Sequence, residues 1–133
     1  MTYDELQRIR KLSEYITDQE ERIERLQSQI EKITATINQN ASTGQKFARD
    51  RMADDIAVLL DMKTELLYAI IDKKQKIQEV KAQIEKLPWE QCRLMSLRYL
   101  DGLSWRIVSD RMHYDIRSCF KIHRKALHSL GII

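Results

Sequence analysis

The feature that most constrains the fold of this chain is a run of isoleucines at every seventh position in its first third. The run is Ile9, Ile16, Ile23, Ile30 and Ile37, and the positions three residues after the first four hold Leu12, Gln19, Leu26 and Ile33. Apolar residues that return at alternating intervals of three and four form one stripe along an α-helix, and four such repeats are typical of a coiled coil. The pattern therefore predicts one long amphipathic helix.

A second apolar stripe follows after the polar segment 38–44, whose sequence NQNASTG is rich in turn-forming residues. It consists of Met52, Ile56, Leu59, Lys63, Leu66, Ile70, Lys73, Ile77, Val80, Ile84 and Leu87. The two lysines are its polar positions, and their stems can pack while the ammonium groups reach water. Two helices of about 35 residues, or roughly 50 Å, joined by a short polar turn are expected to fold antiparallel.

The two stripes also predict a register for this hairpin. Pairing positions whose numbers sum to 89 places Ile30 opposite Leu59 and Ile9 opposite Val80. The polar positions then face apolar ones, so that Gln19 lies opposite Ile70. In an antiparallel pair the two apolar positions of the heptad face each other, which is the condition that this register meets.

The second stripe is wider than one partner helix can cover. Leu60, Leu67, Tyr68 and Ile71 lie beside it at helical spacing. A second copy of the chain, forming a four-helix bundle, is the expected cover, since two-fold homodimers are the commonest oligomers. The alternative is that these side chains pack on helices from the C-terminal part of the same chain.

Composition agrees with an all-α fold, because 133 residues contain only three glycines and one proline. The predicted organisation is an antiparallel coiled-coil hairpin over 1–87, with its turn at about 38–48, and a three-helix domain over 88–133. Neither a membrane span nor a leader peptide is expected. Cys92 and Cys119 match no paired-cysteine motif, which favours a reduced, cytoplasmic protein.

Charge is distributed unevenly between the two parts. Residues 1–86 hold 15 basic and 16 acidic side chains, whereas residues 87–133 hold eight basic and four acidic ones, a net charge of +4. Residues 116–133 contain four basic side chains and no acid. A basic terminal helix is the electrostatic signature of a protein that binds a phosphate backbone. A solvated basic surface explains the same charges, so charge alone leaves both interpretations open.

The segment 88–133 reads as three short helices. Pro88 is suited to the first position of a helix that runs to about Leu100, and Gly102 is suited to the turn that follows. Ser104 and Asp115 are expected to cap helices over 104–112 and 116–130. Apolar residues spaced by three and four predict one core, made of Leu94, Leu97, Leu103, Val108, Met112, Cys119, Ile122, Ala126 and Leu127.

The last helix of a helix-turn-helix presents its first two turns to base edges in the major groove of DNA. Arg117, Ser118 and Lys121 fall there and away from the predicted core. Arginine and lysine suit guanine, and serine can serve several bases. Five other side chains are candidates for contacts to the DNA backbone. They are Ser104, Arg106, Arg111, Arg124 and Lys125.

The segment LRYLDGLSWRIVSDRMHYDIRSCFKIHRKAL resembles region 4 of bacterial sigma factors in its spacing of apolar residues and in its GLS and AL motifs. Together with the N-terminal hairpin, it resembles the sigma-region-4-like regulators of phages and prophages, akin to the ArpU and RinA late-gene activators. The sigma-like match covers about a third of the chain. The resemblance implies a transcriptional regulator of late phage genes that binds double-stranded DNA in a bacterial cytoplasm, and possible contact with RNA polymerase.

The sequence departs from that pattern at two places. His113 stands where the turn usually carries glycine, and histidine tolerates positive φ better than most residues. Ile107 stands where such modules usually show a surface glutamate, and an exposed isoleucine would indicate a protein contact. Trp89 and Trp105 raise the same question, although packing between the hairpin base and the three-helix domain is the favoured interpretation for both.

No motif of an enzyme is present, so neither catalysis nor a small-molecule substrate or cofactor is expected. Cys119, His123 and His128 are spaced along one helix face, as in half of a zinc site, but Cys119 falls on a core position and no second pair is present, so no metal is expected. His123 is expected to approach a phosphate or water, and Phe120 a thymine methyl or the first short helix. The rival hypothesis is an adaptor that binds RNA polymerase or a host factor.

Overall fold

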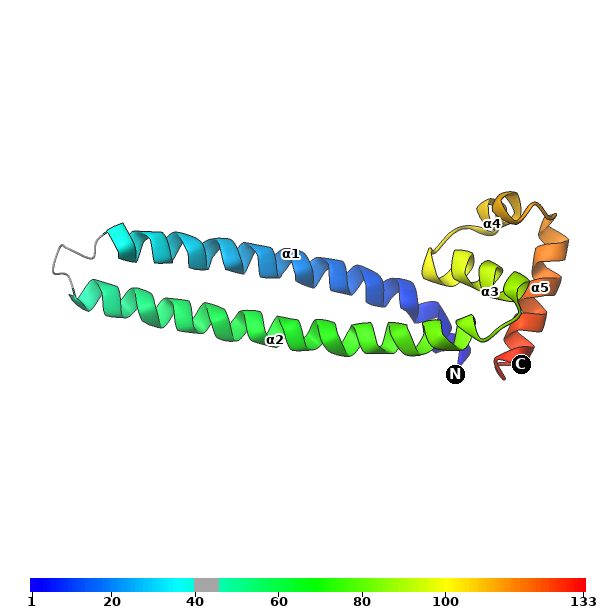
Figure 1. Ribbon diagram of the computed structural model, residues 1–133, viewed down its shortest axis with the longest axis horizontal. Helices are drawn as coiled ribbons and strands as arrows, with labels where there is room; N and C mark the ends of the chain where they lie inside the picture. Colours follow the sequence, from blue (N-terminus) through cyan, green and yellow to red (C-terminus); the bar gives the residue numbers. More distant parts are fainter. Residues whose placement is uncertain (40–45) are drawn as a thin grey trace. The chain divides into compact units, whose positions relative to one another are not determined.

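The computed structural model describes residues 1–39 and 46–133, and every element that it shows there is helical. Two long helices are followed by shorter ones (Figure 1). The elements are α1 (Tyr3–Gln39), α2 (Lys46–Glu85), α3 (Trp89–Met95), the π-helical turn η1 (Ser96–Leu100), α4 (Trp105–Met112) and α5 (Ile116–Ser129). The all-α prediction is confirmed for the described residues, and the two long helices pack against each other as an antiparallel pair.

The helix ends differ from the predicted ones near the first turn. The turn was predicted over about 38–48, but α1 continues to Gln39 and α2 already begins at Lys46. Polar residues at the end of a long helix keep their backbone hydrogen bonds whether or not a partner covers them, so the apolar stripe marks the buried part rather than the helix end. The rest of the predicted turn, residues 40–45, lies outside the described residues.

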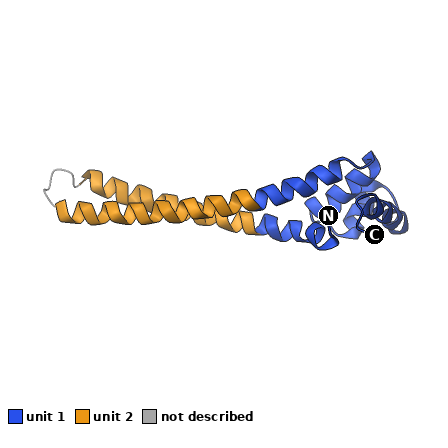
Figure 2. Ribbon diagram, turned by 90° about the horizontal axis from the view of Figure 1, so that it is seen from below, with its two compact units in different colours: residues 1–14, 73–133 blue, residues 15–72 orange. Residues whose placement is uncertain are grey.

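Residues 15–72 form one of two compact units (Figure 2). Every predicted seam position within this unit is buried or half-buried, including Gln19 at 4% exposure and Ile70 at 5%. Lys63 Nζ donates a hydrogen bond of 2.8 Å to Gln27 Oε1, next to its predicted partner Leu26. These contacts agree with the predicted register to within one residue.

A disulfide provides a direct test of the register. Ile30→Cys and Leu59→Cys, combined in a Cys92→Ser background, should form an intramolecular disulfide under mild oxidation, because the predicted register places these two seam positions opposite each other. Non-reducing mass spectrometry of the monomer measures the loss of two hydrogens. The single Ile30→Cys variant is the control, and a double variant that forms only intermolecular disulfides would contradict the register.

The wide face of α2 remains uncovered in the single chain. Leu60, Leu67, Tyr68 and Ile71 are 45%, 42%, 70% and 53% exposed. Cover by a second copy and packing on the C-terminal helices both stay predictions.

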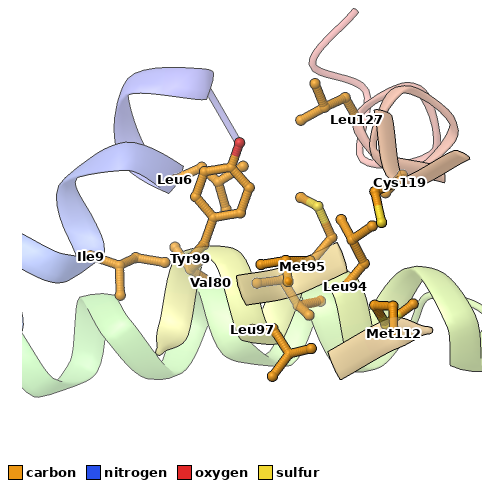
Figure 3. Close-up of a cluster of buried hydrophobic side chains, with 13 residues drawn as sticks. Leu6, Ile9, Val80, Leu94, Met95, Leu97, Tyr99, Met112, Cys119 and Leu127 are labelled. Carbon is orange, nitrogen blue, oxygen red and sulfur yellow. The ribbon is translucent and has the colours of Figure 1, made fainter. Parts of the chain in front are cut away.

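The second compact unit consists of residues 1–14 and 73–133. Its core includes Leu94, Met95 and Cys119, each fully buried (Figure 3), and Val108, which is also fully buried. The predicted core residues are buried there, with Leu103 and Ile122 partly buried against the cluster. The core also includes residues of both hairpin helices. The sequence pattern predicted three of them only as positions of the hairpin seam and did not predict burial of the fourth. The four residues are Leu6, Ile9, Val80 and Ile84.

The turns of this unit follow the local chemistry of their residues. Ser104 caps α4 by accepting a hydrogen bond from the Ile107 N–H, and Asp115 caps α5 through the Ser118 N–H, as predicted. His113 ends α4 in the left-handed conformation with φ 60°, which confirms the expected positive φ at this non-glycine position. Pro88 lies just before α3 rather than inside it, and its carbonyl accepts the first helical hydrogen bond, from Cys92 N–H.

The predicted helix from 88 to about 100 changes its hydrogen-bonding pattern in the middle. After Met95 the chain continues as a single π-helical turn, and the Asp101 N–H bonds to the Ser96 carbonyl at 2.9 Å. A π-turn inserts one extra residue and rotates the residues that follow it. Leu97 and Tyr99 lie within this turn, and both are buried.

None of the helices in the described ranges combines the length and the apolar character that a membrane span requires.

Candidate nucleic-acid interface

The first turn of α5 is organised by Asp115. Its carboxylate accepts a hydrogen bond of 2.9 Å from the Ser118 N–H. Hydrogen bonds from the Ser118 side chain and backbone lower the pKa of Asp115, and the charges of Arg117 and Lys121 act in the same direction. The hydroxyl of Ser118 is thus engaged with the cap, and the residue is half-buried. Of the three predicted base-reading residues, Ser118 is thus the one that is hydrogen-bonded to the N-cap residue of its own helix.

The exposed face of α5 is basic and its buried face is apolar. Cys119, Ala126 and Leu127 are buried against the core, whereas Arg117 and Lys121 are exposed. Arg124 and Lys125 are exposed further along the same helix. Successive residues of an α-helix are offset by about 100°, so a sequence that puts small and apolar residues on one side leaves these cations on the other. The structure therefore brings four of the predicted residues onto one helix surface.

An open groove of ≈580 Å³ runs along this surface. It is lined by Gln91, Lys121, Arg124, Lys125, His128, Ser129 and Ile133. Gln91, from the first turn of α3, could not be assigned from the sequence because its position depends on how α3 packs against α5. His128 could have been assigned to this surface from the sequence, because it follows Lys121 by seven residues and Arg124 by four, and both are helical spacings. All of these side chains can donate hydrogen bonds to an acceptor in the groove except Ile133.

The predicted backbone-contacting residues of α4 are also at the surface. Ser104, Arg106 and Arg111 are all exposed. Arg111 is tied down through its backbone, because its carbonyl accepts a hydrogen bond of 3.1 Å from the Arg93 guanidinium. The side chain of Arg111 is therefore presented from a fixed backbone position.

His123 lies in an aromatic cluster and not on the exposed basic face, which corrects its predicted role near a phosphate or water. Its Nε2 is 2.7 Å from the Tyr99 hydroxyl, and its ring meets the edge of Trp105 at 4.7 Å between centroids. Phe120 also packs against Trp105 in a T-shaped contact. The Arg98 guanidinium lies 4.9 Å from the Trp105 ring centroid. Trp105 thus joins α4 to α5 within the three-helix domain, whereas it was expected to pack between the hairpin base and that domain.

This cluster predicts a pH dependence of stability. Burial lowers the pKa of His123 below its ordinary value, and the Arg98 charge acts in the same direction. The unfolded chain therefore binds this proton more readily, so the contribution of His123 is present above pH ~6.5 and is lost as the pH falls further. The melting temperature should drop between pH 7.5 and pH 5.5 by more in the wild type than in His123→Gln, which can keep the bond to Tyr99. Equal drops in both proteins would contradict the assignment.

Trp89 corrects a second expectation. It was predicted to pack between the hairpin base and the three-helix domain, but it is 74% exposed and lies over the Arg93 guanidinium at 5.6 Å. As the first residue of α3 it points away from the core that Leu94 and Met95 enter. Ile107 is 42% exposed, as expected for a residue on the outer face of α4.

The residues weighed as half of a zinc site have other partners. Cys119 is fully buried, and burial raises the pKa of its thiol. His123 bonds to Tyr99, and His128 Nδ1 lies 3.2 Å from the Ile133 carbonyl. Within the described ranges, no group of three or more histidine, cysteine or acidic side chains is placed to hold a metal ion.

Comparison with known proteins found no family model, no curated protein and no solved structure that matches this chain.

Proposed function

We propose that this protein is a sequence-specific regulator of transcription that binds double-stranded DNA, with α4 and α5 acting as a helix-turn-helix and residues 116–129 lying in the major groove. The observation that carries the proposal is the exposed basic face of α5, which holds four cations and is part of a segment without any acid from 116 to 133. A cationic helix surface of this kind suits the phosphate-lined groove of a duplex.

In this proposal, one set of residues reads base edges and a second set contacts phosphates. Arg117 and Lys121, in the first two turns of α5, read base edges, with Ser118 beside them. Arg124, Lys125, Ser104, Arg106 and Arg111 contact phosphates and supply affinity without sequence preference. The Ser104 N–H and the first turn of α4 add a helix N-terminus, which favours a phosphate oxygen.

The test is a fluorescence anisotropy titration against duplex fragments from the neighbourhood of the gene, at two salt concentrations. We expect one fragment to bind with high affinity and with a steep loss of affinity as salt rises, because each phosphate contact releases counterions. Weak binding to all fragments alike would contradict a sequence-specific regulator.

The biological setting follows from the resemblance to phage regulators. We propose a bacterial cytoplasm, phage or prophage late genes as targets, and no enzymatic activity. A second copy is the proposed occupant of the α2 face formed by Leu60, Leu67, Tyr68 and Ile71, which is exposed in the single chain. A two-fold dimer would offer two α5 helices to two half-sites on one duplex.

An adaptor that binds RNA polymerase or a host factor is the second candidate. The exposed side chains of Trp89 and Ile107 favour it, since large apolar residues at a surface are common in protein interfaces. An adaptor has no need for a salt-dependent affinity for DNA, so the same titration separates the two functions.

A further inference from the structure

A cavity of ≈200 Å³ lies within the unit formed by residues 1–14 and 73–133, apart from the groove on α5. It is lined by Tyr3, Gln7, Arg10, Arg98, Tyr99 and Gly102. Five of these six residues carry side-chain hydrogen-bond donors, two of them are arginines, and no carboxylate lines the cavity. The lining therefore favours an acceptor that carries negative charge.

Arg10 is held in place by the turn that follows η1. Its Nη1 donates a hydrogen bond of 3.0 Å to the Gly102 carbonyl, and its Nε lies 3.6 Å from Glu14 Oε1. Gly102 has φ +68°, and a Cβ at that position would come within 2.9 Å of Arg10 Cδ. The positive φ of this turn favours glycine, and an added Cβ would also require the Arg10 side chain to shift. The remaining nitrogen, Nη2, can serve a ligand that enters from solvent.

Arg98 is held by contacts of its own. Its Nη1 donates a hydrogen bond of 2.9 Å to the Leu103 carbonyl, while its guanidinium lies against the Trp105 ring. The Tyr99 hydroxyl beside it is hydrogen-bonded to Tyr3 and to His123. Figure 3 shows the Tyr99 ring rising beside Leu6 of α1. Arg10, Arg98 and Tyr99 are therefore engaged by contacts within the protein before any ligand arrives.

We infer that this cavity binds a small oxyanion of the phosphate type. Planar guanidinium groups match the oxygen spacing of phosphate and bind it through charge-assisted hydrogen bonds. The cavity is larger than a single water requires, so it can admit a polyatomic anion.

The position of the cavity connects the ligand to the candidate nucleic-acid interface. An anion bound there contacts α1 through Arg10 and η1 through Arg98. Arg98 lies against Trp105, and Trp105 packs against Phe120 and His123 of α5. A bound anion thus stabilises the contacts that set the position of α5. This consequence for DNA affinity rests on the proposed function, whereas the binding of the anion does not.

The test uses the full chain and inorganic phosphate, with potassium chloride at equal ionic strength as reference. At tenfold excess over its Kd, phosphate should raise the melting temperature of the wild type by about 5 °C. Arg10→Gln should weaken phosphate binding at least tenfold by calorimetry, and Tyr3→Phe should weaken it to a smaller extent. Arg8→Gln is the matched control, since Arg8 is exposed on the same helix and does not line the cavity. Circular dichroism checks that each variant is folded.

Equal effects of phosphate on the wild type, Arg8→Gln and Arg10→Gln would show a general salt effect and overturn the inference. A DNA titration of Arg10→Gln in phosphate-free buffer distinguishes a free anion from the phosphates of a duplex. If free phosphate fails to bind while Arg10→Gln loses DNA affinity, the arginines contact the DNA backbone and the free-anion site is refuted. If the wild type binds phosphate but no DNA, the site is supported and the proposed function fails.

Discussion

Replacing both Arg117 and Lys121 with alanine should lower the affinity for the preferred DNA fragment by about 100-fold. Each bidentate contact between a basic side chain and guanine contributes about 1–3 kcal/mol of discrimination. Both side chains are exposed on the first two turns of α5, and neither is part of the core, so the fold should be retained. Anisotropy titration with specific and random duplexes measures the change, and most of the loss should fall on the specific one.

Single variants separate base reading from backbone binding. Arg117→Ala should relax the preference at one base position, whereas Lys125→Ala should weaken binding to all sequences alike and reduce the salt dependence by about one phosphate contact. The control for net charge is the double variant Arg22→Ala/Lys32→Ala, which removes two exposed cations of α1. Unchanged site preference in Arg117→Ala would refute its role in base reading.

Leu94→Ala should lower the free energy of unfolding by about 2–5 kcal/mol. Leu94 is fully buried in the cluster that holds α3, α4 and α5 together, and truncation removes apolar contacts and leaves a cavity. A loss of this size is a large part of the stability of a typical domain. Urea denaturation followed by circular dichroism measures it, at a pH above 7 so that His123 stays neutral in both states.

The matched control is Leu67→Ala. It makes the same chemical change at a residue of α2 that is 42% exposed. It should change the stability of the monomer by no more than about 0.5 kcal/mol. If the Leu67→Ala loss instead grows with protein concentration, a second copy covers this face in solution. A Leu94→Ala variant as stable as the wild type would contradict the packing of α3 in the core.

The hairpin was predictable from sequence because two heptad stripes joined by a short polar turn can bury each other by folding antiparallel. Ile16, Ile30 and Ile70 are buried where the pattern puts them, and Gln19 is buried despite its polarity because its position in the repeat leaves it no other place. The caps Ser104 and Asp115 were predictable for a different reason, since their side chains bond to backbone groups only three residues away.

The contacts between hairpin and C-terminal helices were not predictable in this way. Leu6 lies outside the heptad stripe and is fully buried, and Tyr99, within the π-turn Ser96–Leu100, is buried and hydrogen-bonded to His123. Each of these depends on residues distant in the sequence. The prediction for Trp89 was wrong in the opposite direction. Its large aromatic side chain was expected to be buried, but the packing leaves it exposed.

By itself the sequence determined the helical class, the hairpin seam, the capped turns and the basic surface of α5. These follow from periodicity, from local hydrogen bonds and from charge, which act over at most a few helical turns. Only the tertiary structure decided that α1 enters the C-terminal core, that Gln91 and His128 share a groove with Lys121, and that Arg10 meets Arg98 around a cavity. Such tertiary contacts depend on which buried surfaces pack together, and no single periodic pattern encodes that packing.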